Sequence, residues 1–336
     1  YAKLWIMNGT RTFENSIGSL NELPKKQINF IKDEIIEINY NDNFVTTKSE
    51  DISFDFLIIS MGAVLAPEKI PGLVENGFNL YDHNQLDEIH HKLDKIESGK
   101  IAIVIMAMPY KCPPAPFEAS LLVDSMLRKR GIRDSIQIDF YSPAPITLPA
   151  AGPEVSKKIL DLVNSEKITF HNSKKIIRVE PKKLIFENDE YSFDILLAIP
   201  PHTAPKVIYD SNLAKEPGFI PINRDCKTPH ENIFAVGDVT SLVVTDSMAV
   251  PKAGVFAEGE GIAVAKNIVS KLLSKEPSVL FDGKGGCFLE SGRDTASTIE
   301  VDMFADPKPS TRLTESTKDN LSKKLDFEKE RLSKWL

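Results

Sequence analysis

The middle of the chain alternates apolar runs with one amphipathic stretch. Residues 101–106 are uninterrupted and apolar, residues 117–129 have helical spacing, and residues 136–141 form a second strand-like run. A continuous apolar run is typical of a strand that is buried on both faces of a parallel sheet. The pattern therefore predicts a strand, a helix and a second parallel strand, which is how a dinucleotide-binding fold begins.

A similar series of strand-like runs occurs twice, with a period of about 140 residues. The motif SFDFLII at 53–59 recurs as SFDILLA at 192–198. Two shorter runs recur before it in the same order, pairing 28–30 with 168–170 and 34–38 with 175–179. The repeat predicts a duplicated unit of β-strands. The counterpart of the 101–106 strand would lie about 40 residues before Tyr1, so we expect the first βαβ unit and its glycine-rich phosphate loop to be missing from this chain.

Composition narrows the class of protein. The chain has 336 residues, 42% of them hydrophobic, which predicts a globular enzyme of two or three domains. It has no apolar run of about 18 residues that would span a bilayer. A net charge of −7 without a basic stripe argues against a nucleic-acid partner. Three cysteines are too few for a disulfide scaffold, and no Cys/His spacing suits a metal site.

A strand-like segment at 232–236 ends in Gly237 and Asp238. A glycine at the carboxyl end of a parallel strand lets a ligand approach the backbone, and a carboxylate there can accept a hydrogen bond from a ligand hydroxyl. An ordinary strand-to-loop turn is the alternative interpretation of these residues alone.

In its place along the chain, this segment resembles the second FAD motif of the two-dinucleotide-domain flavoprotein reductases, whose aspartate binds the ribityl chain. Residues 58–63, which include Met61 and Gly62, resemble the family's other landmark, where the chain leaves the FAD domain. The resemblance implies FAD as the cofactor, with Met61, Gly62, Gly237 and Asp238 at its site.

The loop after the 101–106 strand departs from a nicotinamide-binding loop. Ala107, Pro109 and Cys112 stand at the three glycine positions of G-x-G-x-x-G. Pro109 has no N–H and places a ring where the backbone must nearly touch a pyrophosphate. A tight NAD(P)H site is therefore not expected.

Cys112 lies between Lys111 and a proline-rich helix start. The cation and the positive end of the helix dipole both favour the thiolate, which is the reactive form of cysteine. A small buried residue at a strand–helix junction is the alternative. A second cysteine, Cys287, follows a glycine cluster at 283–286, whereas Cys226 is expected to be structural or exposed.

The motif KCPPAPFE at 111–118, together with GCF at 286–288, resembles the sulfide:quinone oxidoreductases and the flavoprotein subunit of flavocytochrome c sulfide dehydrogenase. In that family the two cysteines form a redox disulfide beside the flavin. Residues 251–258, which include Lys252 and Gly254, match the family's segment along the isoalloxazine ring. The resemblance implies that Cys112 and Cys287 are catalytic, and that sulfide is oxidised through FAD. It further implies that another sulfide or a small thiol takes the sulfur, and that a quinone or a cytochrome c takes the electrons.

The fold implied by the resemblance is α/β, with two Rossmann-like dinucleotide-binding domains of the FAD/NAD(P)-binding flavoprotein type and a small C-terminal α+β segment. The expected division is the rest of the FAD-binding domain (1–90), a second Rossmann-like domain with a degenerate loop (91–210), a return to the FAD-binding domain (211–272), and a segment with Cys287 and a helical tail (273–336). The tail is highly charged, with leucines at helical spacing. Three docking sites stay open for the tail: the rest of this chain, a second subunit in a homodimer, or a membrane surface.

Several alternatives stay open. His202, which follows the repeated strand, is a candidate proton relay for sulfide or an ordinary loop histidine. An NADH:quinone reductase of the same fold and a non-catalytic flavoprotein partner of a cytochrome subunit are the competing functions. We expect a cytoplasmic location, peripheral to the membrane at most, while an exported location also stays open.

Overall fold

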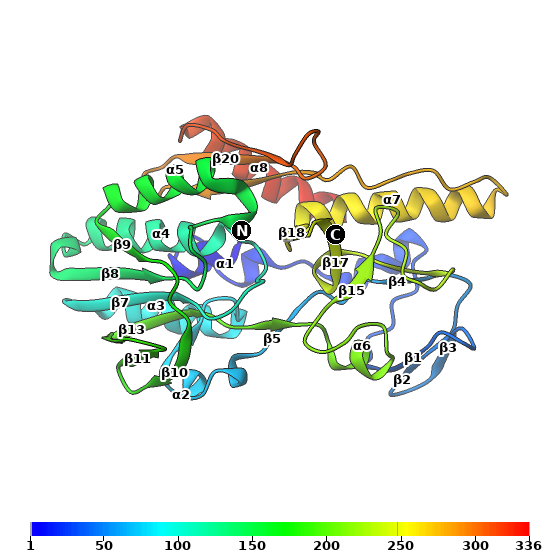
Figure 1. Cartoon of the computed structure of the whole chain (residues 1–336), viewed down its shortest axis with the longest axis horizontal. Helices are drawn as coiled ribbons and strands as arrows, with labels where there is room; N and C mark the ends of the chain where they lie inside the picture. The colour runs from blue at the N-terminus through cyan, green and yellow to red at the C-terminus, as the bar shows by residue number, and fades with distance from the viewer. Residues whose placement is uncertain (1, 247, 336) are drawn as a thin grey trace.

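The centre of the computed structural model, which describes residues 2–246 and 248–335, is a five-stranded parallel sheet (Figure 1). Its strand order is β6 (Phe78–Asn79), β13 (Ile195–Ile199), β7 (Gly99–Ile105), β8 (Ile136–Tyr141) and β9 (Ile168–His171). Helix α4 (Ala115–Lys129) connects β7 to β8, so the predicted strand–helix–strand unit is confirmed. Helix α5 (Gly152–Ser165) makes the next crossover, from β8 to β9.

Both faces of this sheet are covered, which explains the uninterrupted apolar run in β7. Side chains alternate between the two faces of a strand. Ile101, Ile103 and Ile105 accordingly lie in one core with α4 and α5, whereas Ala102 and Val104 lie in a second core. The second core is closed by a small antiparallel sheet of β10 (Ile176–Glu180), β11 (Lys183–Phe186) and β12 (Glu190–Ser192), which Figure 1 shows on the side opposite α4 and α5.

The internal repeat is visible in the structure. The first copy forms an antiparallel sheet of β1 (Ile35–Asn39), β2 (Phe44–Thr47) and β3 (Asp51–Ser53), matching the order of β10, β11 and β12. Each sheet has an irregularity at the same place, between Ile35 and Glu37 and between Ile176 and Arg178. A shared irregularity supports a duplicated unit, because such irregularities are specific features of a strand pair.

One part of the repeat is not strand in both copies. Residues 168–170 lie in β9, whereas the matching residues 28–30 pair with no strand of the part of the chain that the structure describes. Ile28 and Phe30 are exposed. The prediction of a strand at 28–30 is therefore wrong for this structure, since a strand needs a hydrogen-bonded neighbour and β9 has one in β8.

The C-terminal segment forms a layer over the helices. Strands β19 (Lys284–Glu290), β20 (Ala296–Asp302) and β21 (Ser310–Leu313) make an antiparallel sheet, followed by helix α8 (Lys318–Trp335). This layer contacts α4 and α5 at one end and helix α7 (Gly254–Leu272) at the other (Figure 1). The charged tail thus packs on its own protein, which was one of the three open docking partners.

Short elements complete the fold. The helices are α1 (Ala2–Met7), α2 (Leu73–Asn76), α3 (Leu86–Lys95) and α6 (Lys206–Asp210). The remaining strands are β4 (Leu57–Ile59), β5 (Val64–Leu65), β14 (His202–Thr203), β15 (Ile220–Ile222), β16 (Ile233–Ala235), β17 (Thr240–Thr245) and β18 (Met248–Ala249). The 3₁₀ turns are Glu14–Ser16, Leu20–Lys26, Pro67–Lys69, His83–Gln85, Arg133–Ser135, Pro149–Ala151 and Gly237–Val239. Among the described residues, no helix combines the length and the apolar character needed to cross a membrane.

Candidate active site

The loop between β7 and α4 carries Cys112, and its backbone is held from two sides. The backbone N–H of Cys112 donates to the carbonyl oxygen of Lys252 at 2.7 Å, and the hydroxyl of Tyr81 donates to the carbonyl oxygen of Cys112 at 3.3 Å. Cys112 has a φ of +52°, in the left-handed region that side-chain-bearing residues rarely adopt. Such a conformation persists where the surroundings hold it, and it is common at functional sites.

Cys287 reaches the same place from the C-terminal layer. It lies in β19, opposite Ile299 of β20, and is half-buried. Both Cys112 and Cys287 are free thiols here. They line one cavity of about 390 Å³, whose polar lining includes Lys3, Tyr81, Lys111 and Glu118. The structure therefore brings together two cysteines that are far apart in the sequence.

The pKa values of these thiols differ from what the sequence predicted. Solvent reaches part of Cys112 through the cavity, but the protein around its sulfur raises the pKa of the thiol, and a backbone interaction with Ala115 opposes this only in part. Burial also raises the pKa of Cys287. Lys111 contributes no appreciable lowering of the Cys112 pKa; its ammonium donates to the carbonyl oxygen of Ala63 at 3.4 Å. The prediction of a stabilised thiolate at Cys112 is wrong for this arrangement, since desolvation outweighs the helix start.

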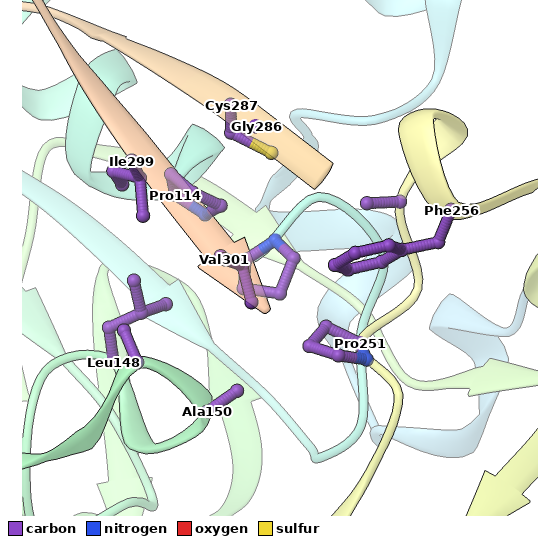
Figure 2. Close-up of a pocket in the computed structure, with 12 residues that line it drawn as sticks. Pro114, Leu148, Ala150, Pro251, Phe256, Gly286, Cys287, Ile299 and Val301 are labelled. Atoms are coloured by element: carbon purple, nitrogen blue, oxygen red, sulfur yellow. The ribbon is translucent and has the colours of Figure 1, made fainter. Parts of the chain in front are cut away.

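Cys287 also lines a second, apolar cavity of about 40 Å³ (Figure 2). Phe256 and Pro251 border it from the α7 side, and Val301 borders it from β20. Cys287 thus lines both a larger cavity with charged residues and a small apolar one. Cys226 lines neither: it is fully buried, and its thiol lies 3.9 Å from the carbonyl oxygen of Glu260.

The two segments predicted to bind FAD meet at one sheet edge. Strands β4 and β16 are parallel, with Ile59 opposite Ala235, so their carboxyl ends point the same way. Met61 and Gly62 follow β4, and Gly237 and Asp238 follow β16. Ligands of open α/β sheets bind at such carboxyl edges.

Asp238 has the features expected of a ligand-binding residue. Within the described part of the chain, its Oδ1 atom is buried without a hydrogen-bond partner. Burial raises the pKa of Asp238, and Lys252 opposes that shift. A ligand hydroxyl would satisfy the unpaired oxygen, because a buried polar atom without a partner is costly. The site therefore fits a hydroxyl-bearing cofactor such as FAD.

Lys252 links the cofactor loop to the thiol loop. Its ammonium donates to the carbonyl oxygens of Asp238 and Thr240 at 2.7 and 3.0 Å, and it lies 3.3 Å from the centre of the Phe219 ring. Burial lowers the pKa of Lys252 to about 8. Gly254 begins α7 two positions after this residue, and at that glycine an added Cβ would meet open space.

Glu260 is a site residue that the sequence analysis missed. It is buried in α7, and its Oε2 atom accepts a 2.5 Å hydrogen bond from the backbone N–H of Gly237. Burial raises the pKa of Glu260 to about 7. The available signal was the run of small residues at 257–265, but it holds two glutamates, and the sequence does not tell buried Glu260 from Glu258, which pairs with Arg331.

His202 lies in β14, next to Tyr81. Its ring is edge-on to the Tyr81 ring, with centroids 5.7 Å apart, and its Nδ1 atom is 2.8 Å from the carbonyl oxygen of Pro200. A carbonyl only accepts, so Nδ1 carries the proton and Nε2 is the basic nitrogen. Among the described residues Nε2 has no hydrogen-bond partner, and burial lowers the pKa of His202 to about 4.

Comparison with known proteins shows which families the chain resembles. A model of the pyridine nucleotide-disulphide oxidoreductases matches residues 137–261. The mitochondrial sulfide:quinone oxidoreductase of Dictyostelium discoideum is 27% identical over 269 residues, 74% of this chain and 59% of that protein. The crystal structure of the sulfide:quinone oxidoreductase from Aquifex aeolicus superposes with a TM-score of 0.90 and 26% identity, covering 99% of this chain and 81% of that one. The chain is homologous to the sulfide:quinone oxidoreductases.

The homology confirms the predicted fold class, an α/β fold of the FAD/NAD(P)-binding oxidoreductases. The family model and these relatives support the predicted cofactor, FAD, and the predicted class of oxidoreductase. The sulfide-quinone reductase of Aquifex aeolicus is 28% identical over 320 residues, 89% of this chain and 73% of that protein. The chain described here spans less than two thirds of the length of the Dictyostelium relative.

Proposed function

We propose that this protein oxidises sulfide through a Cys112–Cys287 redox pair and FAD, and passes the electrons to a quinone. The observation that carries the proposal is that both cysteines line one cavity, while the backbone of Cys112 is bonded to Lys252 of the cofactor loop. The relatives named as sulfide:quinone oxidoreductases support sulfide and quinone as the reactants.

The residues that would hold FAD lie along the edge formed by β4 and β16. The unpaired oxygen of Asp238 would accept a hydrogen bond from a ribityl hydroxyl. Gly237 would let the cofactor approach the backbone closely. Met61 and Gly62 would lie on the other side, and Lys252 would keep the Asp238 loop in place. Bound there, FAD would accept two electrons from the thiol centre and deliver them to the acceptor.

The cysteine pair would carry the sulfur chemistry. Hydrosulfide attacks the disulfide form, so one sulfur–sulfur bond forms, the Cys112–Cys287 bond breaks, and one cysteine becomes a persulfide while the other leaves as a thiolate. A second sulfide or a small thiol then takes the outer sulfur atom. Oxidation of the two thiols back to the disulfide releases two electrons, which FAD accepts.

The charge of the cavity suits this chemistry, because Lys3 and Lys111 line it and attract an anion such as hydrosulfide. His202 lies beside Tyr81, which lines the cavity, and among the described residues its Nε2 atom has no hydrogen-bond partner. Because burial lowers its pKa to about 4, His202 is a weak base, and it would accept a hydrogen bond from a thiol group rather than take up its proton. With a quinone as acceptor, we propose contact with a membrane surface; a cytochrome c is the alternative acceptor.

Anaerobic sulfide titration of the flavin-loaded protein tests the proposal. Sulfide should bleach the flavin, and decylubiquinone should restore its colour faster than cytochrome c does. Cys112→Ser and Cys287→Ser should each abolish bleaching while flavin stays bound, because either change removes the disulfide.

Cys226→Ala is the matched control, since Cys226 is buried away from both cavities, and it should bleach normally. Normal bleaching in either serine variant would refute the redox pair. Rapid bleaching by NADH, with little effect of sulfide, would favour an NADH:quinone reductase instead.

A further inference from the structure

Three buried side chains form an ionic cluster between the segments that carry the two cysteines and helix α8. The ammonium of Lys324, in α8, donates to Glu118 Oε1 at 2.6 Å and to Glu290 Oε2 at 2.7 Å. Glu118 lies six positions after Cys112 and lines the thiol cavity, whereas Glu290 lies three positions after Cys287 in β19. Lys324 is fully buried. The cluster therefore connects the segments that carry the two thiols.

The same carboxylates are also bonded to their neighbours. The backbone N–H of Glu290 donates to Glu118 Oε2 at 3.1 Å, so helix and strand are joined directly. Trp5 Nε1 donates to Glu290 Oε2 at 2.8 Å, and its ring centre lies 4.6 Å from the Lys324 ammonium. A buried ionic cluster is stable only when its members are paired in this way.

A second connection lies about two helical turns further along α4. The hydroxyl of Ser125 donates to the carbonyl oxygen of Gly292, in the turn between β19 and β20. Gly292 has a φ of +72°, and an added Cβ there would lie 2.7 Å from the carbonyl oxygen of Leu121. The turn therefore rests directly on the backbone of α4.

A third connection joins the turn to the C-terminal end of α5. Arg293 donates to Glu166, and Arg128 of α4 donates to the same carboxylate at 3.2 Å. The helix residues of the three connections, 118, 125 and 128, lie on one face of α4, since residues seven and ten positions further along return to the same side.

We infer that these connections, which we call the α4–hairpin clamp, set the spacing of Cys112 and Cys287, and that Lys324 is its positioning residue. The clamp consists of Glu118, Glu290, Lys324, Ser125, Gly292, Arg293, Arg128 and Glu166. The inference rests on the proposed function, because it concerns how readily the proposed cysteine pair closes to a disulfide. Lys324 would act through Glu118 and Glu290, without touching sulfide or flavin.

Charge explains why Lys324 should matter most. Without its ammonium, two buried carboxylates would face each other without their cation. Such carboxylates repel each other or take up a proton, and the strand that carries Cys287 would shift relative to α4. Closure of a disulfide depends steeply on geometry, so a small shift would lower the effective concentration of one thiol at the other.

The test is a glutathione redox titration of the full chain, without sulfide or quinone, with the Cys112–Cys287 disulfide quantified by mass spectrometry. Lys324→Met should lower the equilibrium constant for closure roughly tenfold or more. Ser125→Ala removes one hydrogen bond and should lower it by about threefold. Melting temperature is recorded in parallel, since a purely stabilising role would lower it without changing closure.

Lys323→Met is the matched control. Lys323 is the adjacent lysine of α8, and its exposed ammonium pairs with exposed Asp319 one helical turn earlier. It should match the wild type in closure. Adding Glu290→Gln to Lys324→Met removes one uncompensated charge and should restore part of the lost closure.

The outcomes separate the two proposals. If the wild type closes its disulfide and Lys324→Met closes it equally well, the clamp has no positioning role, whereas the proposed function stands. If Lys324→Met does not fold, Ser125→Ala decides, and closure equal to the wild type overturns the inference. Failure of the wild type itself to form the disulfide would overturn the proposed redox pair, and the clamp's role with it.

Discussion

The backbone N–H of Cys112 donates a 2.7 Å hydrogen bond to the carbonyl oxygen of Lys252. The same lysine holds the Asp238 loop through its ammonium, so one residue supports both the thiol and the proposed cofactor edge. The bond to Cys112 involves backbone atoms alone, and a side-chain substitution at Lys252 should therefore affect the cofactor edge first.

Lys252→Met should weaken flavin binding. The variant leaves the carbonyl oxygens of Asp238 and Thr240 without the ammonium that now donates to both. Loss of these charge-assisted bonds should raise the Kd for FAD by roughly tenfold or more, measured by flavin fluorescence. Lys266→Met, at an exposed position of α7, is the control and should bind flavin normally. Equal affinity in both variants would show that the Lys252 ammonium does not support the site.

Glu260 should make stability depend on pH. Its pKa in the folded protein is about 7, above its ordinary value of 4.5, so the folded state holds the proton more tightly than the unfolded state. Stability should fall as pH rises from about 4.5 to 7 and then level off. Glu260→Gln keeps an acceptor for Gly237 and should flatten the fall, as seen in melting temperatures across that range.

Some slope should remain in Glu260→Gln, because burial also raises the pKa of Asp238. Glu231→Gln, at a highly exposed position, serves as the control and should keep the wild-type profile. A Glu260→Gln profile as steep as that of the wild type would contradict the assignment.

His202 should have the opposite effect on stability over nearly the same pH range. Its folded-state pKa is about 4, below the ordinary 6.5, so protonation favours the unfolded state. Stability should be lost as pH falls from about 6.5 to 4. His202→Phe has no titrating group and should lose less stability over that range in urea unfolding, whereas exposed His91→Phe should behave like the wild type. Identical acid sensitivity of all three proteins would argue against a buried neutral His202.

Two glycines with the same backbone conformation should respond differently to alanine. Gly131 and Gly292 both have a φ of +72°. At Gly131 an added Cβ meets no described atom within 4 Å, so Gly131→Ala should cost about 1–2 kcal/mol of unfolding free energy. At Gly292 the Cβ would lie 2.6 Å from Ser125 Cβ and 2.7 Å from Leu121 O. The overlap should add about 1–3 kcal/mol for Gly292→Ala. Equal costs in thermal unfolding would mean that the turn can move away from α4.

The sequence alone predicted the local and repetitive features of this protein. The strand, helix and strand of β7, α4 and β8 follow from apolar periodicity, because burial on one or two faces imposes a period on the side chains. The duplication follows from order and spacing, and the structure repeats even the strand irregularity at Ile35 and Ile176. The Gly237–Asp238 turn was a candidate ligand site from its residues alone, with an ordinary turn as the alternative, and only the family resemblance pointed to FAD.

Tertiary structure decided what depends on distant parts of the chain. The shared cavity of Cys112 and Cys287 exists because the hairpin of β19 and β20 packs on α4, and no local pattern records that docking. Local reasoning also gave the wrong direction for the pKa of Cys112, because the surrounding protein desolvates the sulfur. The sequence pattern predicts Lys324 to be an exposed residue of a polar helix, yet it is fully buried between two carboxylates. Periodicity reflects the burial of a residue within its own element, whereas ion pairing and desolvation depend on which other elements surround it.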